Sequence, residues 1–276
     1  MKTQMNLIFA TVMLLAASVM AQAQNSAKEP IYNDGERLEY IISYNASVWP
    51  RTDMGEVVFA TKAENYNNVP TYKISADAST NNFFSFFYRL DDHFHTYVDQ
   101  KTLRPLAHEC EKKEGNWHFG SKIDFDWRTL TASTWWKNFK RTTDNTKTLS
   151  LSPQSMDPIC YFYKIRSQDF STWKDGDEQT IEIVLEDTVQ QIKYRLLNRE
   201  EVTIPKYKPI KALKFSCQLS RSISEDGKSR DNFYIWISDD PNKIPVLVEA
   251  PTKIGKIKAR LHRMSGLKHE NTNILK

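Results

Sequence analysis

The chain has 276 residues, with 38 basic and 34 acidic side chains and a formal net charge of +4 at pH 7. This charge balance is too small and too dispersed to favour nucleic-acid binding. Only 8 residues are glycine, where average usage would give roughly 19, and no G-x-G pair, P-loop or nucleophile elbow occurs. Glycine-built nucleotide sites are therefore excluded. Because no catalytic motif is found, we expect a protein that is not an enzyme and needs no cofactor.

Residues 1–23 have the features of a cleavable signal peptide. Lys2 precedes a mostly apolar run, Leu7–Met20, and then a small-x-small cleavage site at Ala21–Ala23. The run is shorter than the about 20 residues that a membrane span needs, and no later stretch is apolar enough. We expect export to the periplasm, with outer-membrane association or secretion as alternatives. Processing would leave 37 basic and 34 acidic residues, a balance of +3.

Most of the remaining chain has the period-two pattern of half-buried strands. In Arg37–Tyr44, for example, Leu38, Tyr40 and Ile42 occupy alternate positions. Residues 232–261 are expected to form two strands, a turn and a third strand, and residues 263–276 a polar tail. Further strands are expected at residues 57–62, 71–78, 89–99, 106–113, 117–126, 128–134, 179–186, 189–198 and 211–220.

One short helix is expected at residues 157–166. Asp157 is a candidate N-cap, and Pro158 stands at the first helical position. Strands joined by turns, without intervening helices, favour an antiparallel sheet, and a sheet this large must curl or close. We therefore predict a single mainly β domain over residues 24–262. It would be a large curved antiparallel sheet, a half-barrel or barrel, with one short helix.

Two aromatic clusters are candidate ligand-binding residues. Phe83, Phe84, Phe86 and Phe87 form either part of the core or the lip of an apolar groove. Trp135 and Trp136 begin a stretch of aromatic and basic residues that ends at Arg141. That stretch could touch lipid head groups or a glycan. The favoured interpretation is a strand edge whose lysines block edge-to-edge pairing.

A zinc site is a further hypothesis. His93 and His95 share one face of their strand, and His108 and Cys110 share one face of the next. If paired residue numbers sum to 203, the four groups meet, and imidazole and thiolate are zinc ligands. A register slip of one residue would separate them. The alternative is that these are polar residues on the solvent face of a curved sheet.

The cysteine count is odd. Cys110, Cys160 and Cys217 allow at most one intramolecular disulfide. Three buried thiols are the alternative, since free cysteine is commonly buried as a small apolar residue.

Short motifs in a fixed order extend along most of the chain. They are Gly35-Glu36-x-Leu38-x-Tyr40-x-Ile42-x-Tyr44, Gly55-Glu56, Asp99-x-x-Thr102-Leu103-x-Pro105, and Trp236-x-Ser238-Asp239-Asp240 with Ile244-Pro245-Val246 and Gly255. Together they resemble the exported bacterial envelope proteins of the domain of unknown function 3108 family. The resemblance implies an exported β-rich protein and implies no activity.

The first functional hypothesis is a binding protein that holds an apolar or lipid-like ligand on the concave face of its sheet. The alternatives are an envelope structural module with a protein partner, the zinc-site protein described above, and a glycan-binding protein that uses exposed aromatic residues.

Overall fold

The computed structural model describes residues 30–46, 49–86, 89–219, 232–252 and 255–270. The chain divides into two units, residues 1–30 and 31–276, and the description below concerns the second. The expected signal peptide and the end of the expected tail lie outside the described residues. No helix in the described ranges has the length and hydrophobicity needed to cross a bilayer.

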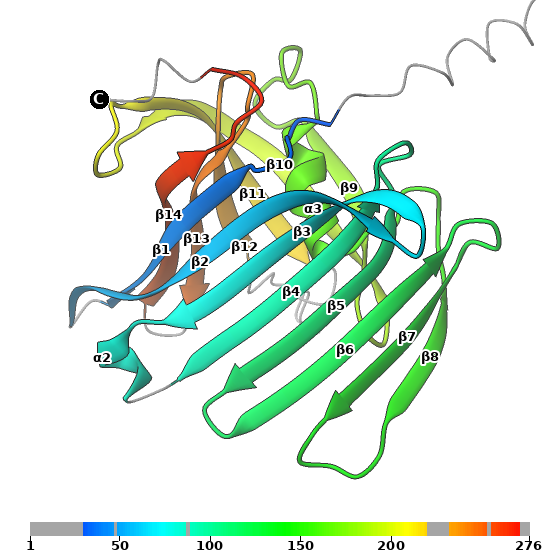
Figure 1. Ribbon diagram of the computed structural model, residues 1–276. Helices are drawn as coiled ribbons and strands as arrows, with labels where there is room; N and C mark the ends of the chain where they lie inside the picture. The colour runs from blue at the N-terminus through cyan, green and yellow to red at the C-terminus, as the bar shows by residue number, and fades with distance from the viewer. Residues whose placement is uncertain (1–29, 47–48, 87–88, 220–231, 253–254, 271–276) are drawn as a thin grey trace, which may run out of the picture. The chain divides into compact units, whose positions relative to one another are not determined.

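The predicted fold class is confirmed: a 14-stranded antiparallel sheet dominates the structure (Figure 1). Its order is β8-β7-β6-β5-β4-β3-β2-β1-β14-β13-β12-β11-β10-β9, so β1 and β14 pair in its middle and β8 and β9 are its edges. The elements are β1 (Arg37–Ala46), β2 (Trp49–Tyr66), β3 (Val69–Thr80), α2 (Asn82–Ser85), β4 (Leu90–Asp99), β5 (Pro105–Glu114), β6 (Trp117–Asp126), β7 (Thr131–Asn138), β8 (Asn145–Ser150), α3 (Pro158–Arg166), β9 (Glu178–Val184), β10 (Val189–Val202), β11 (Ile210–Leu219), β12 (Asn232–Ser238), β13 (Pro245–Thr252) and β14 (Gly255–Ser265).

Several boundaries differ from the predicted ones. Trp135 and Trp136, expected at a strand edge, lie within β7, which is paired on both sides, with β6 and with the edge strand β8. The short polar strand β8 was not predicted, because its sequence NTKTLS has no apolar alternation. A second helix, α2, carries part of the phenylalanine cluster. Strand β14 continues to Ser265, three residues beyond the expected domain boundary.

Helix α3 is the centre of the core. The side chain of Asp157 caps it by accepting from the amides of Ile159 and Cys160, as expected. Ile159 and Tyr163 pack against β3 and β4, while Tyr161 and Ile165 pack against β9–β12. Apolar residues on two sides of the helix are therefore buried, because the sheet curls around it.

Because the sheet curls, its edge strand β9 lies in the interior, with residues on both of its faces packed against other elements. Ile181 and Ile183 contact the core around α3, whereas Val184, on the opposite face of β9, packs against Ile123 and Leu149 of β6 and β8. Met156 forms a parallel bridge with Ile183. Part of the open edge of β9 is thereby covered, which limits its association with other strands.

A buried ion pair joins α3 to the start of the sheet. Both side chains, Arg166 and Glu36, are fully buried, and the guanidinium donates to the two carboxylate oxygens at 2.7 and 2.9 Å. Arg166 Nε also donates to the carbonyl of Asn242, at 3.3 Å. This network fixes the end of the helix between β1 and the β12–β13 turn.

Candidate functional site

The inner face of the sheet, which faces α3, is buried to different extents along the strands. Near the helix it is fully buried: Leu38 and Ile74 are 0% exposed and Val98 is 1% exposed. Towards the end of the sheet that carries α2, the same face is only half-buried. We call this half-buried region the inner strip. It consists of Ile42, Val57, Ala78, Phe94, Phe119, Val248 and Ala259.

The strand register places these residues on one face. Val57 pairs with Ala78 of β3 and with Tyr40 of β1, whose side chain is in the core. Ile42 pairs with Ala259, which in turn pairs with Val248. Seven different strands therefore contribute to the inner strip, and helix α3 is too short to cover it.

Two ionisable residues interrupt this apolar face. Ala78 pairs with Asp92, and Asp92 pairs with Lys112. Burial raises the pKa of Asp92, and the nearby carboxylate of Glu114 raises it further. The Lys112 ammonium lies 5.4 Å from the Phe94 ring centroid and 5.8 Å from that of Phe119, within the range of cation–π contact. An apolar strip with a few convergent polar groups is the usual composition of a small-molecule site.

Sequence patterns alone did not identify Asp92 and Lys112. The signal was present, because Phe94 and Val98 mark one face of β4 as apolar and Asp92 stands in phase with them. An acidic residue on the apolar face of a strand indicates a candidate site, since buried acidic residues are uncommon.

The expected zinc cluster does not form, because the register differs from the predicted one. Phe94 pairs with Cys110 and Thr96 with His108, so paired numbers sum to 204. His93 and His95 therefore lie on the outer face, and His108 and Cys110 on the inner face. In the part of the chain that the structure describes, no group of three or more His, Cys, Asp or Glu side chains is arranged to hold a metal ion.

His108 instead belongs to a buried polar cluster at the start of α3. Its Nδ1 lies 2.8 Å from the hydroxyl of Thr96, and this hydroxyl donates to Asp157 Oδ1 at 2.8 Å. Burial alone would raise the pKa of Asp157, but hydrogen bonds from His108 and Cys160 hold it below its usual value. The cluster is therefore a structural anchor for the helix N-terminus.

The three cysteines are free and buried, which agrees with the second alternative given by the sequence. Burial raises the pKa of the Cys110 and Cys217 thiols to about 12. A raised thiol pKa is typical of buried structural cysteines and not of reactive ones.

The predicted aromatic residues fall into three places. Phe83 and Phe86 protrude from α2, 68% and 87% exposed, Phe84 is half-buried, and Phe87 lies outside the described residues. Trp136 faces inward, opposite Ser121 of β6. Trp135 faces outward, where its indole donates to Asp144 at 3.0 Å.

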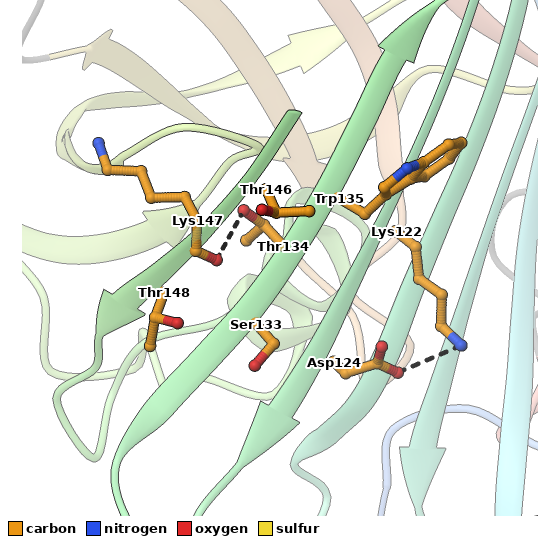
Figure 2. Close-up of a pocket in the computed structure, with 8 residues that line it drawn as sticks. All are labelled: Lys122, Asp124, Ser133, Thr134, Trp135, Thr146, Lys147 and Thr148. Atoms are coloured by element: carbon orange, nitrogen blue, oxygen red, sulfur yellow. Dashed lines mark hydrogen bonds and ion pairs between the residues drawn. The ribbon is translucent and has the colours of Figure 1, made fainter. Parts of the chain in front are cut away.

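Trp135 borders a groove on the outer face of β6, β7 and β8, with a volume of about 560 Å³. Figure 2 shows the ion pair between Lys122 and Asp124 on one side and the Thr134 hydroxyl donating to the Lys147 carbonyl on the other. The groove is lined by Lys122, Asp124, Ser133, Thr134, Trp135, Thr146, Lys147 and Thr148. Its polar lining contrasts with the apolar inner strip.

The family model described as "Protein of unknown function (DUF3108)" matches residues 18–262. A search of curated proteins gave no match. Among solved structures, the chain is similar to a "Beta-barrel-like Protein of Domain of Unknown Function DUF1849 from Brucella abortus". The two share 10% sequence identity and a TM-score of 0.56, over 87% of this chain and 100% of that one. At this identity the likeness extends to the fold alone.

Proposed function

This chain belongs to the DUF3108 family of proteins of unknown function, and from that premise we propose that it is an exported, non-enzymatic binding protein for an apolar or lipid-like ligand. The ligand lies along the inner strip. The observation that carries this proposal is the difference in side-chain burial along one face of the sheet. Leu38 and Ile74 are fully buried where α3 covers them, whereas Val57 and Ala78, further along, remain half-buried.

The chemistry of the inner strip supports a ligand with a long apolar part and one polar end. Burial of apolar surface contributes roughly 25 cal/mol per Å², so seven aliphatic and aromatic residues give an alkyl chain a sizeable contact. Lys112 supplies a cation on the same face, where it suits a carboxylate or phosphate group. A fatty acid or a lysophospholipid has this combination.

The test is a titration with a fluorescent fatty acid, 11-(dansylamino)undecanoic acid, below its micelle concentration. Val57 and Val58 form a matched pair, because these half-buried neighbours on β2 point to opposite faces. Val57→Asn should weaken binding at least five-fold, and Val58→Asn should leave it unchanged. No binding by the parent protein, or equal losses in both variants, would exclude the inner strip as the site.

A second candidate function rests on the outer groove. The groove places Trp135 beside the hydroxyls of Ser133, Thr146 and Thr148. Glycan sites have this composition: an aromatic ring stacks on a sugar ring, and protein hydroxyls exchange hydrogen bonds with the sugar hydroxyls. Titration with tri-N-acetylchitotriose tests it. Trp135→Ala should abolish binding and Trp136→Ala, on the opposite face, should not. Absence of binding by the parent would remove this candidate and leave the inner strip unaffected.

A further inference from the structure

The exposed large apolar side chains are concentrated at one end of the sheet. In the described ranges they are Phe83, Phe86, Trp117, Leu130, Phe139, Leu197 and Ile257. Phe83 and Phe86 lie on α2 in the β3–β4 connection, and the others at this end are Trp117, Phe139 and Ile257, at or next to the β5–β6, β7–β8 and β13–β14 turns. In an antiparallel meander these turns all fall at the same end, which we call the α2 end; Figure 1 shows α2 and the β5–β6 and β7–β8 turns there.

The geometry of α2 fixes its two phenylalanines outward. Asn81 caps the helix by accepting from the amide of Phe84 at 2.9 Å. The Asn81 side-chain amide donates to the carbonyl of Asp53 at 2.7 Å, and its backbone amide donates to Met54. Phe83 and Phe86 are three residues apart and so lie on the same side of a helical turn. Their exposure is thus held in place by the sheet.

Such exposure needs a physical reason. An isolated exposed apolar residue is ordinary, but a cluster of large apolar residues on one surface marks an interaction site. Phe139 and Trp117 add ring surface at the same end of the sheet: Phe139 stacks on His118 at 4.1 Å and Trp117 on Phe119 at 5.2 Å. The α2 end therefore presents several aromatic rings on a rigid support.

The charges at the α2 end favour an anionic surface. Lys140 and Arg141 directly follow Phe139, are exposed, and make no ion pair within the described ranges. Two of the neighbouring acids are already paired, Asp144 with Lys137 at 2.6 Å and Glu111 with Lys113 at 2.9 Å. Aromatic rings with adjacent lysine and arginine are the combination found where proteins enter the head-group region of bilayers.

We propose that the α2 end docks on an anionic lipid bilayer. Phe83, Phe86 and Phe139 enter the boundary between head groups and acyl chains, and Lys140 and Arg141 contact the lipid phosphates. Docking goes beyond the ligand proposed above and does not need it. One consequence rests on that proposed function: the half-buried inner strip continues to this same end, so a docked molecule exchanges its apolar ligand with the bilayer.

Flotation of the purified protein with vesicles tests the docking. The vesicles contain phosphatidylethanolamine and phosphatidylglycerol at 3:1, with pure phosphatidylcholine for comparison. We expect the parent protein to float with the anionic vesicles. Phe83→Ser/Phe86→Ser should require at least ten-fold more lipid, and Lys140→Gln/Arg141→Gln should lose the preference for anionic lipid. Unfolding midpoints within about 2 °C of the parent would show that these variants fold.

Leu130→Ser/Leu197→Ser is the matched control, because both residues are 36% exposed and lie away from the α2 end. It should float like the parent. Failure of the parent to float, or equal flotation of Phe83→Ser/Phe86→Ser, would overturn the docking. If the parent self-associates but does not float, and Phe83→Ser/Phe86→Ser abolishes the self-association, the surface binds a second copy of the chain. That result would also overturn the docking. In vesicle-free solution Phe83→Ser/Phe86→Ser should still bind the fluorescent fatty acid, so the docking and the proposed ligand fail separately.

Discussion

The Glu36–Arg166 pair offers a quantitative test of how α3 is held inside the sheet. Glu36→Gln removes the carboxylate that accepts both guanidinium bonds and leaves Arg166 as a charge with 0% exposure. Breaking a buried ion pair by removing one partner costs about 3–5 kcal/mol. For a domain of this size, one kcal/mol shifts the melting temperature by roughly 2–4 °C, so the expected decrease is roughly 6–20 °C.

The assay is urea unfolding followed by tryptophan fluorescence, with thermal unfolding by circular dichroism. Glu39→Gln is the nearby control in β1, because Glu39 pairs with Arg37 and Arg263, which are 49% and 68% exposed, and exposed pairs contribute about 0–1 kcal/mol. Glu36→Gln/Arg166→Met should be less destabilised than the sum of its single variants, since the unpaired charge is gone. A loss below about 1 kcal/mol for Glu36→Gln, or an equal loss for Glu39→Gln, would refute this account of the network.

Three further predictions concern titration and thiol chemistry. The pKa of Asp157 is depressed in the folded state, so its contribution to the free energy of unfolding is present at neutral pH and is lost as pH falls through that pKa. Asp157→Asn should therefore flatten the fall in stability below about pH 4. An unchanged fall would contradict this prediction. The hydrogen bond to Asp77 raises the pKa of His93, so the stability that this pair contributes is present at acidic pH and is lost as pH rises through the raised pKa. His93→Gln should lower the urea midpoint at pH 5.5 but not at pH 9. Equal shifts at the two pH values would count against this prediction. In the folded protein no thiol should react with 5,5′-dithiobis(2-nitrobenzoic acid), and three should react in urea; rapid reaction of the native protein would contradict the burial of Cys110, Cys160 and Cys217.

The fold was predictable because its signals are local. Alternation within β1, the Asp157-Pro158 helix start and the turn before Pro245 each depend on neighbouring residues. Together they predict many antiparallel strands, one short helix and the need for curvature.

The inner strip was not predictable, because it depends on the relation between strands. Its residues come from seven strands, and whether each is covered depends on where α3 ends. The proposed zinc site failed for the same reason: a register sum of 204 instead of 203 moved His108 and Cys110 to the other face of the sheet. The exposure of Phe83 and Phe86 likewise follows from the anchoring of Asn81 to β2, which their own sequence does not reveal.

The pairing of β1 with β14 has a consequence for how the chain reaches this structure. Leu38 pairs with Met264, so β14, which follows the other 13 strands of this sheet in sequence, completes the middle of the sheet and not its margin. Before it arrives, the ribbon β1–β8 and the ribbon β9–β13 each present an unpaired edge where β14 belongs. Contacts between such distant positions form slowly, and open edges invite aggregation. The complete sheet therefore cannot form until β14 has joined the two ribbons, and a partly folded chain that has not yet placed β14 exposes two pairing edges at once.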